Sequence, residues 1–240
     1  MTDRAPDLRE YRERLRERFG KGSFEGFYCH EILELVLSYA LPRQDFRVAA
    51  RRLLEKFNGL RGVFDATADE LAGVEGVGEA AATLIRLFKE TAGAYLKDRM
   101  MCKDVIKNQK DVLDYLNLTL SGERVEKFLA MYLNAKNEVL AIEILHEGTI
   151  NQTVVYPRKA IEKAFKHNAQ SVIFVHNHPS GDATPSRIDR ELTAVLGRAA
   201  TAVDIVVHDH LIIGRNKHFS ARENGWMLPH HGRPITAVIK

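Results

Sequence analysis

Two histidines separated by one residue stand at the end of an apolar run, where they could bind a metal ion. Residues 172–175 are apolar, and His176 and His178 follow them directly. Because side chains at positions i and i+2 of a strand point to the same side, both imidazoles could reach one ion. Ser186 and Asp189 lie three residues apart at the start of a predicted helix, and therefore on one helical face. Two histidines, one aspartate and an open fourth position describe a catalytic zinc site.

The start of this helix also has a purely structural interpretation. Ser186-x-x-Asp189 matches a capping box, in which the two side chains only satisfy helix N–H groups. Thr184 is a good helix cap, and Pro185 suits the first helical position. In the catalytic interpretation, the Ser186 hydroxyl donates a hydrogen bond to a developing oxyanion, and the general base is a carboxylate from another segment. The spacing alone leaves both interpretations open.

The whole string resembles a known metalloprotease motif. H-x-H, seven residues and then S-x-x-D match the JAMM (MPN+) signature. The wider string HNHPSGDATPSRIDRELT, with GTINQTVVYPR upstream and DHLIIG downstream, is similar to the bacterial RadC family over essentially the whole chain. This resemblance implies an α/β fold like that of cytidine deaminase and zinc bound by His176, His178 and Asp189. It also implies that Ser186 is the oxyanion-stabilising serine.

The same family uses a glutamate at the start of an early strand as its general base. In this chain Glu126 leads into the apolar stretch 127–133, so the resemblance implies Glu126 as the base. Glu123 is the main alternative, and Glu143 and Glu147 are weaker ones. A solvated charge at a strand end is the structural alternative for Glu126.

Two nearby features bear on the same site. RadC-like sequences commonly carry a glutamate after the Pro-Arg pair, whereas this chain has Lys159 there, which removes a carboxylate near the expected site. His208-Asp209-His210 could form a second metal site, but a short cluster without further ligands is weak evidence. We expect Asp209 and His210 instead to orient a loop near the first site or to support its ligands.

The second part of the chain contains the elements that must position these groups. Apolar patterns predict strands over residues 127–133, 139–145, 152–155, 171–175, 203–207 and 211–214, and helices over residues 158–168 and 186–200. Strands separated by helices predict an α/β domain, which we place at residues 104–240. Residues 1–100 form a helical module, with helices predicted over residues 8–19, 30–41, 46–57, 67–71 and 79–96. The predicted fold class is therefore α+β or α/β, an all-helical N-terminal module followed by a JAMM/MPN-like α/β domain.

The N-terminal module contains a candidate nucleic-acid site. Residues 71–81 resemble a helix-hairpin-helix, whose glycines let backbone N–H groups approach phosphate oxygens. Residues 43–61 carry a basic stripe, whereas Glu75 and Glu79 flank the hairpin and oppose a phosphate. The candidate DNA contacts are Gly76, Gly78, Arg47 and Arg51. The alternative is a helix-packing hairpin or a protein–protein module.

Composition excludes several classes of protein. The chain has 240 residues and is 45% hydrophobic, enough for two modest domains, and no apolar run approaches the length of a membrane span. The charged N-terminus lacks the apolar stretch of a signal peptide, and Cys29 and Cys102 are too few for a disulfide framework, so we expect a cytoplasmic protein. The formal net charge is only +3, which argues against nucleic-acid binding by charge alone.

These observations predict a zinc-dependent hydrolase of peptide or isopeptide bonds, with Zn²⁺ as cofactor and a peptide or protein as substrate. In this interpretation Glu126 takes up the water proton and passes it to the leaving amine. One alternative is a DNA-binding or DNA-processing repair factor whose zinc domain is a nuclease or a non-catalytic scaffold. Another is a pseudoenzyme that holds zinc without turnover. No membrane partner and no particular oligomeric state is predicted.

Overall fold

The computed structural model describes residues 7–101, 103–148, 155–215 and 217–227, and the chain divides into two compact units, Met1–Ala92 and Gly93–Lys240. We call them the helical unit and the sheet unit. The division falls inside the long helix α6 (Gly78–Met100), a few residues before the change in composition near residue 100. None of the described helices combines the length and the apolar character that a membrane crossing requires.

The helical unit is built from short helices with defined starts. Its elements are α1 (Leu8–Gly22), α2 (Cys29–Ala40), α3 (Phe46–Lys56), α4 (Leu60–Asp65), α5 (Ala68–Ala72) and the first part of α6. Asp45 caps α3 by accepting a hydrogen bond from the Arg47 N–H, and Thr67 begins α5 with a capping box to Glu70. One apolar core holds these helices together, and it includes Leu15, Leu33, Leu37, Phe46 and Leu53.

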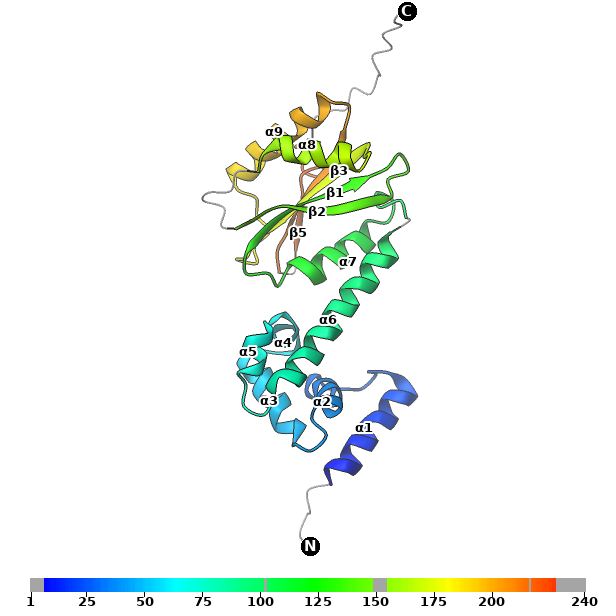
Figure 1. Ribbon diagram of the computed structural model, residues 1–240, viewed down its shortest axis with the longest axis vertical. Coiled ribbons are helices and arrows are strands. Elements are labelled where there is room, and N and C mark those ends of the chain that lie inside the picture. The colour runs from blue at the N-terminus through cyan, green and yellow to red at the C-terminus, as the bar shows by residue number, and fades with distance from the viewer. Residues whose placement is uncertain (1–6, 102, 149–154, 216, 228–240) are drawn as a thin grey trace, which may run out of the picture. The chain divides into compact units, whose positions relative to one another are not determined.

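The sheet unit contains a mixed five-stranded sheet with helices on both faces (Figure 1). Its elements are α7 (Gln109–Leu120), β1 (Glu126–Leu133), β2 (Val139–Gly148), α8 (Pro157–Lys166), β3 (Ser171–Asn177), α9 (Arg187–Thr201), β4 (Val206–Ile213) and β5 (His218–Ser220). The strand order is β2-β1-β3-β4-β5. Only the pair β3–β4 is parallel; the other described pairs are antiparallel.

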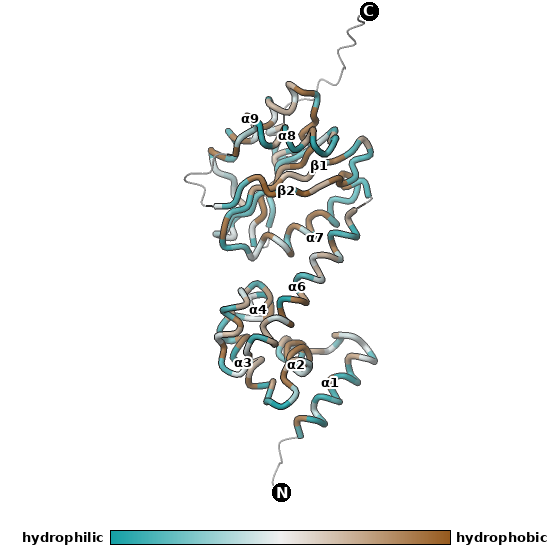
Figure 2. Tube along the Cα trace, in the orientation of Figure 1, coloured by the Kyte–Doolittle hydropathy of each residue, from teal (hydrophilic) through white to brown (hydrophobic). Residues whose placement is uncertain are grey.

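Alternation along β1 and β3 divides the apolar residues between two cores. Phe128 and Phe174 face α8 and α9, whereas Met131 and Val175 face α7. Both central strands are buried on both faces, which explains why they are almost continuously apolar. The hydrophobic colour along β1 shows this pattern (Figure 2).

The structure corrects several expectations from the sequence. The two strands predicted over 203–207 and 211–214 are one strand, β4, because Asp209 and His210 between them pair with β3, with an irregularity in the register at His208. Ser186, not Thr184, is the N-cap of α9, so Pro185 precedes the helix. Helices α4 and α7 and strand β5 were not predicted, and most of the strand expected over 152–155 lies outside the described residues.

Candidate metal centre

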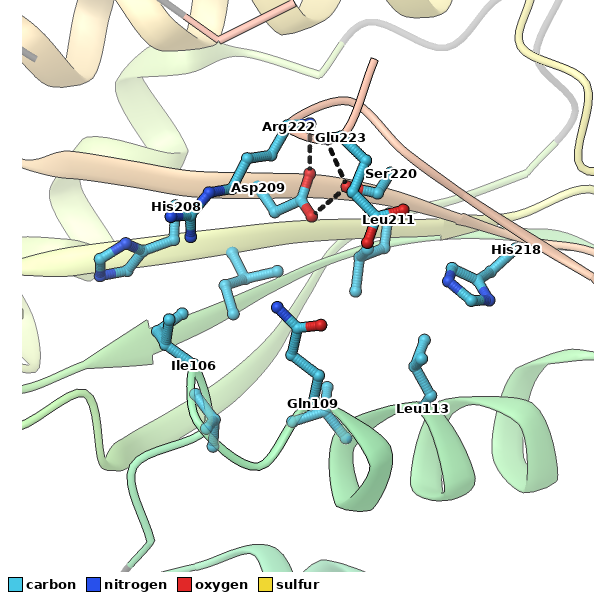
Figure 3. A pocket seen from close by; sticks show the side chains of 13 residues that line it. Ile106, Gln109, Leu113, His208, Asp209, Leu211, His218, Ser220, Arg222 and Glu223 are labelled. Carbon is cyan, nitrogen blue, oxygen red and sulfur yellow. Dashed lines mark hydrogen bonds between the residues drawn. The ribbon is translucent and has the colours of Figure 1, made fainter. Parts of the chain in front are cut away.

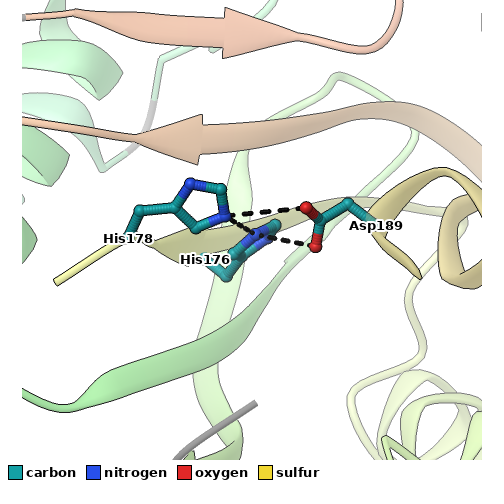
Figure 4. Close-up of side chains that lie close together, drawn as sticks. All are labelled: His176, His178 and Asp189. Carbon is teal, nitrogen blue, oxygen red and sulfur yellow. Dashed lines mark hydrogen bonds and ion pairs between the residues drawn. The ribbon is translucent and has the colours of Figure 1, made fainter. Parts of the chain in front are cut away.

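His176, His178 and Asp189 converge on one point beside the end of β3 (Figure 4). His176 is the next-to-last residue of β3, His178 follows the strand, and Asp189 lies in the first turn of α9. Each offers one ligand atom, and these atoms all lie within 4.8 Å of one another. His176 and Asp189 are almost fully buried, at 1% and 3% exposure. The three side chains that the sequence pattern singled out therefore lie close together in the fold.

The ligand atoms lie close enough together to share one metal ion. The Nε2 atoms of His176 and His178 lie 3.1 Å apart. Asp189 Oδ1 lies 3.2 Å from His176 Nε2, and Asp189 Oδ2 lies 3.6 Å from His178 Nε2. Ligands bound at zinc distances in a tetrahedron are separated by about 3.3 Å, from the bond lengths of about 2.0–2.1 Å. Each imidazole nitrogen thus lies at about this spacing from one oxygen of Asp189, a different oxygen for each imidazole, and the three side chains could together hold a metal ion.

The charges of the three groups suit a divalent cation. Burial opposes ionisation of Asp189, but the hydrogen bonds to His176 and His178 hold the pKa of its carboxyl well below the usual range. Burial lowers the pKa of His176, so this imidazole is neutral. The hydrogen bond to Asp189 raises the pKa of His178. Below neutral pH, a cation that binds here must therefore displace a proton from the His178 imidazole.

His178 is held in the correct tautomer by the loop that follows β3. Its Nδ1–H donates to the backbone carbonyl of Asp182 at 2.7 Å, which leaves Nε2 free to accept an ion. The loop turns at Gly181, whose φ is +83°, and it packs closely against Gly214. A Cβ at Gly214 would lie only 2.5 Å from the Gly181 carbonyl oxygen. Glycine at this position therefore lets the loop reach the conformation that orients His178.

His176 is oriented by a directed chain of hydrogen bonds through buried side chains. The Thr193 hydroxyl donates to the backbone carbonyl of Asp189 at 2.6 Å, and a carbonyl can only accept. Thr193 Oγ1 must therefore accept from His210 Nδ1–H, also at 2.6 Å. Burial keeps the pKa of His210 well below its usual value, so the ring is neutral and its Nε2 accepts from His176 Nδ1–H at 2.9 Å. His176 consequently presents the Nε2 lone pair to the centre.

Ser186 and Asp189 form the capping box and also border the metal centre. The Ser186 N–H donates to Asp189 Oδ2 at 2.6 Å, and the Asp189 N–H donates to Ser186 Oγ at 3.2 Å. The cap uses Ser186 Oγ only as an acceptor, so its own O–H hydrogen can still be donated. Ser186 therefore keeps one hydroxyl hydrogen that the cap does not use.

Glu126 is the carboxylate that the β1–β3 register brings toward the centre. Phe128 pairs with His176, so continuing the antiparallel register by two residues places Glu126 opposite His178. Glu126 is 6% exposed. Burial raises the pKa of its carboxyl to about 7; nearby His178 lowers that pKa, and Asp189 raises it. A buried carboxyl with a raised pKa, close enough to His178 and Asp189 to feel their charges, is a candidate general base.

The other candidate bases are engaged elsewhere. Glu123 forms an ion pair with Lys127 at 2.7 Å, and Glu147 lies 3.9 Å from the same ammonium group. Glu143 bonds to Lys163 and His167 on α8, and the bond from Lys163 lowers the pKa of the Glu143 carboxyl. These contacts favour Glu126 over all three.

The three residues of His208-Asp209-His210 point to different surroundings. His208 Nε2 lies 2.9 Å from Asn137 Oδ1, and His210 turns toward His176. Asp209 accepts hydrogen bonds from the Ser220 hydroxyl and from the Arg222 N–H. Among the described residues, the only cluster suited to a metal is that of His176, His178 and Asp189. The structure therefore does not support a second metal site at residues 208–210.

Asp209 lines a small cavity between α7 and the strands β4 and β5 (Figure 3). Gln109 and Leu113 come from α7, and His218 from β5. The volume of about 40 Å³ holds no more than a few water molecules. None of the three ligands or Glu126 lines it, so we do not assign it to the metal centre.

The glycines of the predicted hairpin lie at an exposed turn before α6. Gly76 and Gly78 have φ values of +86° and +67°, the region that glycine adopts most easily. Both glycines are exposed, whereas Val74 and Val77 on either side of Gly76 are buried and anchor the turn. The backbone at this turn is accessible.

The predicted arginine contacts are less favourable for an anion. Arg47 forms a two-pronged bond with Asp45, at 2.9 and 2.8 Å, which partly neutralises it. Arg51 is exposed on α3. Arg52 is the arginine that lies against the hairpin, and it bonds to both the carbonyl and the carboxylate of Glu75.

The sequence analysis did not assign a defined role to three residues around the metal centre. Thr193 was not singled out, although it lies four residues after Asp189 on the same helical face. His210 was expected near the site without a defined contact. Asn177, between the two histidines, was not assigned a role, and it is 1% exposed.

The chain is similar to several known proteins over most of its length. A family model described as the RadC-like JAB domain matches residues 106–226. The chain is 40% identical to a UPF0758 protein of Ruegeria pomeroyi over 92% of this chain and 98% of that protein. It is 38% identical to UPF0758 proteins of Fusobacterium nucleatum and Rhodobacter capsulatus, over 91% and 88% of this chain and 97% and 99% of those proteins.

Proposed function

The chain belongs to the RadC family, and on this premise we propose that its metal centre is a zinc site that hydrolyses peptide or isopeptide bonds. The observation that carries the proposal is the convergence of His176, His178 and Asp189, whose ligand atoms all lie within 4.8 Å of one another. Zinc, when bound there, lowers the pKa of water and polarises a carbonyl group.

The protein's own residues supply the proton transfers and the charge stabilisation. Glu126 takes a proton from the attacking water and returns it to the leaving amine. The pKa of this carboxyl falls when a cation is bound nearby, which favours the ionised form that accepts the proton. Ser186 donates its hydroxyl hydrogen to the substrate oxygen as negative charge develops. His210 and the Asp182 carbonyl keep the two histidines in the tautomer that binds an ion.

Metal analysis tests the ligand assignment. Purified wild-type protein should retain one equivalent of zinc, and His178→Ala and Asp189→Ala should lose it. Glu191→Ala is the control, because this carboxylate lies on the same helix as Asp189 but is exposed and pairs with the exposed Arg187. Stoichiometric zinc in either ligand variant would refute the assignment.

A peptide and isopeptide library tests the reaction. Cleavage that requires zinc and is abolished by Glu126→Gln supports a hydrolase, provided that the variant still binds zinc. A zinc-loaded wild-type protein that cleaves nothing in the library would indicate a pseudoenzyme. Cleavage of DNA by the same preparation, lost in Glu126→Gln, would instead indicate a nuclease.

We propose as a second function that the helical unit contacts DNA through a helix-hairpin-helix. The observation that favours it is the exposed turn with Gly76 and Gly78 at the N-terminus of the 23-residue helix α6. Binding of the full chain to duplex DNA should weaken with salt, and Arg51→Glu should weaken it at least tenfold. The control is Arg9→Glu on α1, since Arg9 is equally exposed but lies on another helix. Equal effects of both substitutions would refute a specific site.

A further inference from the structure

Asn177 makes contacts that neither of its histidine neighbours makes. It is the last residue of β3, and alternation turns its side chain away from the side that carries His176 and His178. Although it is an amide at a strand end, it is 1% exposed. A polar side chain buried to this extent must find hydrogen-bond partners within the protein.

The Asn177 amide finds these partners on the backbone on both sides of Glu126. Its Oδ1 accepts the Lys127 N–H at 2.9 Å. Its Nδ2 donates to the Val125 carbonyl at 3.2 Å and also lies 3.5 Å from the Glu123 carbonyl. The side chain therefore replaces a peptide group and extends the β1–β3 ladder by one step beyond the last paired residues, Phe128 and His176.

The other side of this backbone segment is held by β2. Glu126 itself pairs with Gly148, the last residue of β2. Neighbouring residues of a strand direct their backbone N–H and C=O groups to opposite sides. The backbone groups of Glu126 therefore point toward β2, whereas those of Val125 and Lys127 point toward Asn177 and bond to its side chain. The backbone that carries the carboxyl is thus fixed from both directions.

We propose that Asn177 is a positioning residue that ties the strand bearing the metal ligands to the strand bearing the general base. The role assigned to Glu126 rests on the proposed function, but the clamp itself does not. Because Asn177 lies between His176 and His178 in the chain, any shift of β3 carries the ligands and the backbone of Glu126 together. Asparagine suits this position because one neutral side chain supplies both an acceptor and a donor. Aspartate would keep only the acceptor, and alanine would keep neither.

Amide hydrogen exchange of the zinc-loaded full chain tests the clamp directly. In Asn177→Ala, the Lys127 amide should exchange roughly tenfold faster, while the Met131 amide in the same strand should change much less, because a hydrogen bond is lost only at Lys127. Asn177→Asp retains the acceptor and should keep the Lys127 amide slow. Val175→Ala is the matched control on β3, since it removes buried methyl groups without touching these bonds and should affect both amides alike.

Two further measurements separate positioning from general damage. Zinc affinity, measured by competition with a chelator, should stay within about threefold of wild type in Asn177→Ala, because the amide contacts no ligand atom. On any peptide that the wild type cleaves, kcat should fall at least tenfold with KM little changed. Equal acceleration of the Lys127 and Met131 amides, or a parallel loss of zinc affinity, would overturn the proposal. If the wild type cleaves no peptide, the proposed function fails, and the exchange and zinc measurements still decide the clamp.

Discussion

The hydrogen-bond chain behind His176 makes a prediction that can be tested by removing a single oxygen atom. Thr193→Val is nearly isosteric and deletes the hydroxyl that accepts from His210 Nδ1–H and donates to the Asp189 carbonyl. Thr193 is 4% exposed and His210 1%, so water does not readily replace the lost partner. The substitution leaves a buried N–H group without an acceptor.

The expected size of the effect follows from the two ways in which His210 can respond. If the ring keeps its proton on Nδ1, the orphaned donor costs about 1–3 kcal/mol of folding free energy. For a domain of this size, that cost lowers the melting temperature by roughly 2–12 °C.

If the His210 proton moves to Nε2, it points at His176 Nδ1. His176 must then carry its own proton on Nε2, where the ion binds. The first response costs folding stability but leaves the His176 tautomer unchanged. The second response weakens metal binding, and loss of such supporting bonds typically lowers metal affinity about 10- to 100-fold.

The assay is zinc affinity by chelator competition, together with thermal unfolding of the zinc-free protein. Thr193→Ser keeps the hydroxyl and should bind zinc within a few-fold of wild type. Thr201→Val makes the same chemical change at the exposed end of α9 and serves as the control. Unchanged zinc affinity together with an unchanged melting temperature in Thr193→Val would refute the directed chain. An equal loss in Thr193→Ser would show that packing, not the hydroxyl, supports His176.

Three other changes have defined outcomes. Because the pKa of Glu126 is raised in the folded state, the zinc-free wild type loses stability as pH rises from about 4.5 to about 7. The unfolding free energy of Glu126→Gln, measured in denaturant titrations at each pH, should therefore rise relative to that of the wild type over this range, by up to about 3 kcal/mol. A difference between the two proteins that does not change with pH contradicts this. Gly214→Ala should unfold at lower temperature and bind zinc more weakly, because its Cβ would meet the Gly181 carbonyl oxygen at 2.5 Å, and wild-type zinc affinity would contradict this. Asp189→Asn should retain the cap geometry yet lose at least tenfold in zinc affinity, measured against chelators, since the anionic ligand is gone, and no loss would exclude Asp189 as a ligand.

The sequence predicts that His176, His178 and Asp189 lie together because their arrangement is local. His176 and His178 share a strand end, and Asp189 follows after one loop, so period-2 and helical spacing indicate the cluster that the fold contains. The groups that support the ligands depend on pairing between distant segments. His210 reaches His176 through the parallel pairing of β3 and β4, and Asn177 reaches Lys127 across 50 residues. No local pattern contains that register.

The errors in the sequence-based secondary structure have a related cause. Three polar residues in a row at 208–210 are typical of a loop, so β4 was predicted as two strands. In the fold, each of these side chains has a specific partner within the sheet unit, which removes the cost of burying it. Helix α7 had a usable signal in the four-residue spacing of Val112, Leu116 and Leu120, whereas β5 has only three residues and carries almost none.

The two interpretations of Ser186 and Asp189 were posed as alternatives, and the structure shows why the sequence could not separate them. A carboxylate has two oxygens, and Asp189 uses Oδ2 for the cap at Ser186 N while Oδ1 lies beside His176 Nε2. The cap fixes the rotation of the carboxylate, so Oδ1 is held toward His176, while Oδ2 serves the cap and also lies 3.6 Å from His178 Nε2. Ser186 is divided in the same way, since its oxygen accepts from the helix and its hydrogen is free to donate. A structural capping box is therefore the device that aims both side chains at the metal centre.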